Sequence, residues 1–317
     1  MEERNPFMVK KARPLVLGHR GVPLLHQENT LAAFHRAREL GVDGVELDVR
    51  CTRDGEVVVF HDDETTRLTG VAGRIEDMTW DQVSRLRIQR DLFMGKAADG
   101  SDVVLRYERE ERIPLLAEVL DELAGALAIN VELKPATPNW RERHVGTRTA
   151  RVIRDAAVLD SVIVTSFDFF KLHALEKEHS PIHSGFAYDD DFALVLPRWI
   201  SRLPDLETQV TEIAEGESRN REALVNRLFE ANRIGRWIGA SVVAGEHTLI
   251  EPDSIGRFKA RGTAVGTFTF FPLEMTGVRH HLSDEAQVSR LRELHEQGVD
   301  WIETDDPVRA IELLERV

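Results

Sequence analysis

The sequence has a single cysteine, Cys51, and no hydrophobic run long enough to cross a bilayer. One cysteine excludes a disulfide within the chain. A membrane-spanning helix needs about 20 consecutive apolar residues. Residues 1–14 lack the apolar segment of a secretory signal peptide. We therefore expect a cytoplasmic protein with no transmembrane segment.

Basic residues are also in deficit, with 41 Lys and Arg against 55 Asp and Glu and a formal charge of -14. Nucleic-acid binding needs a basic surface, and the only basic run is residues 10–13, so no nucleic-acid partner is expected. With 42% hydrophobic residues and no low-complexity tract, the chain can bury a large core. A length of 317 residues suits either one barrel domain with an insertion or two domains.

Nine short apolar runs with β-branched residues predict strands. They are 15–19, 45–49, 57–61, 129–133, 162–166, 183–188, 238–244, 265–270 and 301–304. Amphipathic stretches that predict helices separate most of them: 31–40, 115–123, 147–158, 169–178, 222–234, 253–261, 285–297 and 307–314. This alternation predicts an α/β fold with a parallel sheet, whose closed form is the eight-stranded TIM (β/α)8 barrel. The ninth strand is explained by an Asp-Gly turn at residues 53–56, which leaves no room for a crossover helix.

Two segments interrupt the alternation. Residues 66–112 are polar and carry one helix signature, a capping box from Thr79 to Gln82. We interpret them as a small insertion, after the HD-containing strand, within a single domain of residues 1–317. Residues 189–221 are interpreted as a mostly helical excursion from the barrel.

Charged residues share one face of two predicted strands. In GVELDVR, Glu46 and Asp48 alternate with apolar residues, and in INVELK, Glu132 and Lys134 do the same. In a barrel this face points inward, and active sites form at its carboxyl-terminal rim. Three carboxylates that converge there need a cation, and an all-oxygen site suits Mg²⁺ or Ca²⁺. An antiparallel sheet with its polar face in water would explain the alternation equally well.

Histidines end two of the predicted strands, beside the proposed cation site. A lone histidine at a strand end is usually structural, but His19 and His61 flank a carboxylate cluster and can act as base and acid. Arg20 and Lys134 are cationic donors suited to phosphate. Each could instead form an ion pair with a neighbouring carboxylate.

Over most of its length the chain resembles the glycerophosphodiester phosphodiesterase family, a group of TIM-barrel enzymes. The matching text includes GHRG, ENT, ELD, FHD and INVELK in the family's order, followed by VIVTSFD and GVDWIETDDP. The resemblance implies a catalytic acid/base pair formed by His19 and His61. It implies one divalent cation, Mg²⁺ or Ca²⁺, with the ligands Glu46, Asp48 and Glu132. It implies phosphate contacts from Arg20 and Lys134.

Two further positions follow from the same resemblance. Glu28, in the ENT motif, is expected near the site. Near the seventh barrel strand the family commonly has Trp-Thr-Val-Asn, whereas this chain has VGTFTFF, with Phe268 in place of the Trp and Phe271 at the Asn position. These aromatic residues either belong to the core or make the mouth more apolar, which would admit an acyl or other hydrophobic alcohol.

The implied activity is metal-dependent hydrolysis of a small glycerophosphodiester to glycerol 3-phosphate and an alcohol, with two histidines as acid and base. One alternative is a lysophospholipase D-like hydrolysis of a lipid phosphodiester. Another is a non-catalytic barrel that binds a phosphorylated or lipid ligand. A third is a different metal-dependent barrel enzyme, such as a sugar isomerase or aldolase. The sequence does not predict the head group, the choice of ion or the oligomeric state.

Overall fold

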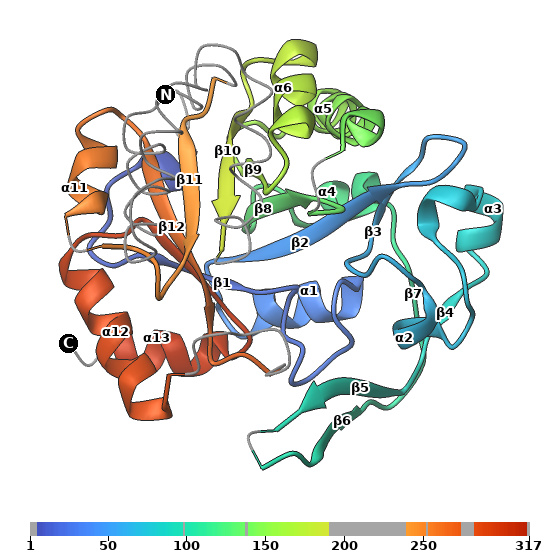
Figure 1. Cartoon of the computed structure of the whole chain (residues 1–317), viewed down its shortest axis with the longest axis horizontal. Coiled ribbons are helices and arrows are strands. Elements are labelled where there is room, and N and C mark those ends of the chain that lie inside the picture. The colour runs from blue at the N-terminus through green and yellow to red at the C-terminus, as the bar shows by residue number, and fades with distance from the viewer. Residues whose placement is uncertain are drawn as a thin grey trace, which may run out of the picture.

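Parallel strands close into a barrel at the centre of this computed structural model (Figure 1). The residues that it describes are 5–97, 99–136, 139–189, 239–251, 253–273 and 282–315. Among them the barrel has eight strands: β1 (Leu15–Gly18), β2 (Gly44–Cys51), β8 (Ala128–Leu133), β9 (Val162–Ser166), β10 (His183–Tyr188), β11 (Val242–Glu246), β12 (Ala264–Phe270) and β13 (Trp301–Thr304). Strand β1 pairs with both β13 and β2, which closes the ring. The predicted TIM barrel is confirmed.

The ninth strand, β3 (Val57–Val59), pairs with β2 in the antiparallel sense. The turn between them uses Gly55 at φ 95°, a conformation that favours glycine. The predicted hairpin is therefore confirmed. The strand ends at Val59 rather than at His61, so His61 lies on the loop that follows it.

Helices surround the barrel (Figure 1). They are α1 (Leu31–Glu39), α4 (Leu116–Leu123), α5 (His144–Ala156), α6 (Phe169–Glu178), α11 (Ser254–Lys259), α12 (Asp284–Glu296) and α13 (Pro307–Glu315). Their apolar faces pack on outward strand residues such as Val45 and Leu47. No helix in the described part of the chain combines the length and apolar character needed to cross a membrane.

Three predictions differ from the structure or lie outside the described residues. The run predicted at 238–244 forms a strand only from Val242 to Glu246, because Gly239 adopts φ 70° in a turn before it. The predicted helix at 222–234 lies outside the described residues. The same holds for the predicted excursion at 189–221, except for its first residue.

Residues 66–112 pack beside β3, at one side of the barrel in Figure 1. Their elements are α2 (Thr66–Thr69), η2 (Ile75–Asp77), α3 (Trp80–Val83), β4 (Arg87–Ile88), β5 (Asp91–Lys96), β6 (Asp102–Arg106) and β7 (Glu111–Arg112). The capping box at Thr79 is present. The two strand pairs, β4–β7 and β5–β6, were not predicted, because these strands are short and largely exposed.

The barrel interior changes character along its axis. At the amino-terminal end, the helix η1 (Pro6–Met8) inserts Phe7 edge-on against Trp301, with ring centroids 5.4 Å apart. Ile163 and Val242 complete this apolar layer. Gly266 makes room for the indole, since a Cβ there would lie 1.8 Å from a Trp301 ring atom. The polar residues of the interior lie above this layer, toward the carboxyl ends of the strands.

Candidate active site

Three carboxylates meet inside the barrel. Strands β2 and β8 run parallel, with Asp48 opposite Glu132 and Glu46 two residues earlier on the same face. Oxygen atoms of the three carboxylates lie within 4.8 Å of one another, and Glu46 and Asp48 are each 1% exposed. The predicted convergence is confirmed, and the alternative of an antiparallel sheet with its polar face in water is wrong.

The electrostatics of this cluster suit a cation. Burial and the nearby carboxylates of Asp48, Glu303 and Glu132 raise the pKa of Glu46 well above its ordinary value. Burial also raises the pKa of Glu132, against the opposing effect of Lys134. Glu46 Oε1 is buried and has no hydrogen-bond partner among the described residues. These three residues could hold a metal ion, because their donors are all oxygen and their mutual repulsion is only partly offset.

Two cationic side chains border the carboxylates. The Lys134 Nζ lies 2.5 Å from Glu132 Oε1 and 3.3 Å from Asp48 Oδ1. Arg20 Nε lies 3.4 Å from Asp48 Oδ2, and its backbone N–H donates to Glu46. Burial alone would raise the pKa of Asp48, but Lys134 and the other nearby cations outweigh burial and lower it. The ion pairs that the sequence left open are therefore present in this cluster.

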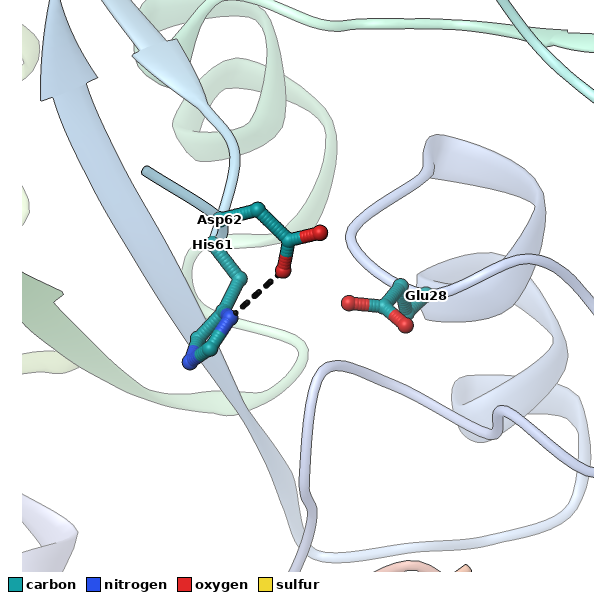
Figure 2. A group of neighbouring side chains, drawn as sticks. All are labelled: Glu28, His61 and Asp62. Carbon is teal, nitrogen blue, oxygen red and sulfur yellow. Dashed lines mark hydrogen bonds and ion pairs between the residues drawn. The ribbon is translucent and has the colours of Figure 1, made fainter. Parts of the chain in front are cut away.

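Each candidate catalytic histidine is paired with an aspartate. His19 Nδ1 lies 2.7 Å from Asp305 Oδ1, and His61 Nδ1 lies 2.9 Å from Asp62 Oδ1 (Figure 2). An Nδ1–H that donates to a carboxylate leaves Nε2 as the atom that can exchange a proton with a substrate. His19 Nε2 is directed toward the carboxylate cluster, 3.9 Å from Glu46 Oε2.

The protonation of His61 reflects its surroundings. Burial lowers the pKa of His61, and the positive charges of Arg20 and Lys134 lower it further, to about 4. Asp48 and the hydrogen bond to Asp62 oppose this shift only in part. The Asp62 carboxylate is also held by Arg67, whose Nε lies 2.7 Å from Asp62 Oδ2. The His61 ring is therefore neutral near pH 7 in the absence of a bound ion or substrate.

The ENT motif supplies three separate contacts. Glu28, 1% exposed, accepts hydrogen bonds from Arg20 and Arg67. Burial alone would raise the pKa of Glu28, but the two guanidinium groups outweigh burial and lower it to about 2. Asn29 donates to Asp48 Oδ2 at 2.8 Å, and Thr30 caps α1 by accepting from Ala33. The loop after β1 thus reaches the carboxylate cluster at two points, the side chain of Asn29 and the backbone N–H of Arg20.

Beside Glu46 lies a further polar group that sequence reasoning missed, with Asn130 opposite Glu46 in the strand register. Glu303 on β13 accepts hydrogen bonds from Asn130 and from the indole N–H of Trp301, at 2.7 and 2.9 Å. Burial raises the pKa of Glu303 to about 7, although both hydrogen bonds act in the opposite direction. The alternation that predicted Glu46 also places Glu303 inward, so the signal was present in WIET.

The aromatic residues near β12 separate into two groups. Phe268 packs edge-on against Phe167, with centroids 5.8 Å apart, and Lys134 Nζ lies 5.8 Å from the Phe167 centroid. Phe167 therefore lies between Phe268 and Lys134 of the polar cluster. Phe271 instead packs against the outer core and stacks beneath the Arg309 guanidinium at 4.1 Å.

Comparison with known sequences places the chain in a family. A sequence model of the glycerophosphoryl diester phosphodiesterase family matches residues 19–309. A glycerophosphodiester phosphodiesterase of Caldanaerobacter subterraneus is 32% identical over 180 residues, which are 56% of this chain and 67% of the relative. A second enzyme of that name, from Bacillus altitudinis, is 31% identical over 51% of this chain and 61% of its own length. The protein YqiK of Bacillus subtilis is 30% identical over 81% of this chain and 95% of its own length.

Solved structures share the fold. A phosphodiesterase from Oleispira antarctica, in complex with the product sn-glycerol-3-phosphate, superposes with a TM-score of 0.60 at 20% identity, covering 96% of this chain and 97% of that one. A glycerophosphodiester phosphodiesterase from Agrobacterium tumefaciens gives a TM-score of 0.60 at 20% identity, covering 94% and 99%. This chain belongs to the glycerophosphoryl diester phosphodiesterase family. The family and the class of enzyme predicted from the sequence are confirmed.

Proposed function

We propose that the protein hydrolyses glycerophosphodiesters to glycerol 3-phosphate and an alcohol, with the help of one divalent cation, Mg²⁺ or Ca²⁺. The observation that carries the proposal is the clustering of three carboxylates, two His–Asp pairs and two cationic side chains at one end of the barrel. The name of the Caldanaerobacter relative and the product bound to the Oleispira phosphodiesterase support it.

The cation would be held by Glu46, Asp48 and Glu132. Their oxygen donors match the preference of a hard ion, and the buried Glu46 Oε1, which has no hydrogen-bond partner among the described residues, would be available to it. A bound ion would supply Lewis-acid stabilisation of the phosphoryl oxygens. It would also relieve the repulsion that raises the pKa of Glu46.

His19 and His61 would carry out the proton transfers. Because each Nδ1 faces an aspartate, each Nε2 is the atom that meets the substrate. One Nε2 takes the proton from the attacking water or from the glycerol hydroxyl of the substrate. Attack by the glycerol hydroxyl gives a cyclic phosphate, which water opens to glycerol 3-phosphate in a second step. The other gives a proton to the departing alkoxide oxygen, and a transfer of this kind typically contributes about 10²- to 10⁴-fold to the rate.

Arg20 and Lys134 would bind the phosphodiester. Both cations already border the carboxylates, with Arg20 Nε 3.4 Å and Lys134 Nζ 3.3 Å from oxygens of Asp48. Their side chains offer N–H donors to the phosphoryl oxygens, where negative charge grows as the nucleophile attacks. Their contribution is therefore greater in the transition state than in the ground state.

A lipid phosphodiester is the second candidate substrate. The Phe167–Phe268 pair adds apolar surface beside Lys134, whose Nζ lies 5.8 Å from the Phe167 centroid. A human relative, 34% identical over 118 residues and 35% of its own length, is named lysophospholipase D. An acyl chain of a lysophospholipid would gain from contact with these two rings.

A substrate screen tests the proposal. The purified protein, supplied with Mg²⁺ or Ca²⁺, is given glycerophosphocholine, glycerophosphoethanolamine, a lysophospholipid and bis(p-nitrophenyl) phosphate. We expect glycerol 3-phosphate from the first two, and faster turnover of the lysophospholipid would favour the lipid substrate. The surface variant His35→Ala, on α1, should behave as wild type. Absence of turnover for every diester would contradict the proposal and leave a binding barrel or a different barrel enzyme.

A further inference from the structure

Arg67 joins two carboxylates at the edge of the site without touching any proposed metal ligand. It lies on α2, in the segment 66–112, and its side chain is 24% exposed. Its Nε and Nη2 donate to Asp62 at 2.7 and 2.9 Å. Its Nη1 and Nη2 donate to Glu28, both at 2.9 Å. A planar guanidinium can form two such forked pairs at once, whereas a lysine ammonium cannot.

Each of the two carboxylates leads to a different residue of the proposed site. Asp62 holds the His61 ring through Nδ1 at 2.9 Å. Glu28 accepts a hydrogen bond from Arg20 Nη1 at 2.9 Å. Arg67 therefore lies between the loop after β3, which carries His61, and the loop after β1, which carries Arg20. Its four hydrogen bonds fix these two loops relative to each other.

Glu28, His61 and Asp62 could in principle hold a cation. Ligand atoms of Glu28, His61 and Asp62 lie within 4.8 Å of one another, and Figure 2 shows the two carboxylates facing each other. Both carboxylates are already paired with the Arg67 guanidinium, which supplies the positive charge that they need. Burial alone would raise the pKa of Asp62, but the hydrogen bond with His61 and the pairing with Arg67 outweigh burial and lower it. The geometry thus favours a built-in guanidinium over a second metal ion.

We propose that Arg67 is a positioning residue for the hydrolysis: it holds Asp62 so that His61 presents Nε2 to the substrate, and it holds Glu28 so that Arg20 stays directed at the phosphate. This inference rests on the proposed function. Through the first contact Arg67 acts on proton transfer, and therefore on kcat. Through the second contact it acts on substrate binding, and therefore on KM.

A double-mutant cycle separates this role from a general loss of folding. Arg67→Met keeps an unbranched apolar side chain and removes the guanidinium with its charge. We expect kcat on glycerophosphocholine to fall about 10- to 100-fold, as for a misplaced catalytic group. In a His61→Ala background, the same change should lower kcat by less than about 2-fold, because the two substitutions act through one group. In a His19→Ala background its full effect on kcat should remain.

Two variants complete the kinetic test. Arg67→Lys keeps the charge but loses the fork, so it should recover only part of the kcat. Arg85→Met removes an arginine of the same segment that pairs with Asp81 at the surface, and it should match wild type. Wild-type kcat in Arg67→Met would overturn the proposal. An equal loss in both histidine backgrounds would also overturn it, since it would indicate a global structural effect.

A second readout does not depend on turnover. In nitrogen-15 NMR of the histidine rings, with the His61 signals assigned from His61→Ala, wild type should show the Nδ1–H form for His61. Arg67→Met should show mixed tautomers for His61 and an unchanged His19. An unchanged His61 would contradict the positioning role even if the protein is active. If wild type turns over no diester but Arg67→Met still shows mixed tautomers for His61, only the proposed function is contradicted.

Discussion

The two ends of the barrel interior are built by the same strands and have opposite chemistry. On β13, Trp301 belongs to the apolar layer at the amino-terminal end, and Glu303, two residues later, belongs to the polar layer. On β8, Ala128 lies in the apolar layer and Glu132 in the carboxylate cluster. On β13 a step of two residues, and on β8 a step of four, therefore separates a packing position from a polar position, because alternate residues share one face.

This difference in chemistry indicates which end of the barrel stabilises the fold. Burying a large apolar side chain contributes about 1.5–3 kcal/mol, so the layer around Phe7 and Trp301 favours the folded state. Burying ionised carboxylates is costly unless each is paired, and Glu46 Oε1 has no hydrogen-bond partner among the described residues. The polar end is therefore expected to carry the reaction at some cost to stability. The apolar end is expected to stabilise the fold without taking part in the reaction.

Removal of either histidine at the polar end should have the largest effect on activity. We expect His19→Ala or His61→Ala to lower kcat on glycerophosphocholine at least ~100-fold, because each removes one proton-transfer group. The midpoint of urea unfolding should stay close to wild type, since both side chains are partly exposed at the rim. Near-normal turnover in either variant would rule out the two-histidine scheme.

Truncation at the apolar end should show the opposite pattern. Phe7→Ala removes a ring that is 1% exposed and packs on Trp301, so the free energy of unfolding should fall by about 3–5 kcal/mol. The kcat of the folded protein should remain close to wild type. Val9→Ala, at an exposed position nearby, should change stability little. A large loss of kcat in folded Phe7→Ala would show that the two ends are not independent.

A smaller effect, on the pH dependence of stability, is expected from Glu303, at the boundary between the apolar and polar layers. The pKa of Glu303, raised by burial to about 7, means that its contribution to stability is present below about pH 4.5 and is lost as the pH rises through 7. The free energy of unfolding of chelator-treated protein should therefore fall between pH 5 and pH 8.

Glu303→Gln should make that fall smaller, because an amide can accept the same hydrogen bonds without becoming charged. Urea titrations at the two pH values measure the difference. The surface variant Glu296→Gln should follow the wild-type curve. If Glu303→Gln also follows it, then Glu303 is not the group that links stability to pH.

The sequence was most informative where local alternation decides the structure. The inward positions of Glu46, Asp48 and Glu132 follow from strand parity alone, and the barrel follows from the order of strands and helices. Glu303 obeys the same rule on β13, where the alternation in WIET places it inward.

The hydrogen-bond partners of the site residues depend instead on which distant segments of the chain meet in the fold. Asp305 lies 286 residues from His19 along the chain, and no pattern near HRG indicates that contact. Arg67 reaches Glu28 across 39 residues, from a segment whose two strand pairs are too short and exposed to leave a clear periodicity. Such contacts are set by the closure of the barrel and by the packing of residues 66–112 against β3, which local sequence does not encode.

The central claim is that the polar end of this barrel is a cation-dependent phosphodiesterase site, and cation removal tests it most directly. Turnover of glycerophosphocholine is measured on chelator-treated protein, then after addition of Mg²⁺ or Ca²⁺, with Glu46→Gln as the variant that weakens the ion site. We expect turnover to be lost on chelation and restored in wild type by one of the two ions, but not in Glu46→Gln. Full activity after chelation, with no metal found by elemental analysis, would contradict the claim.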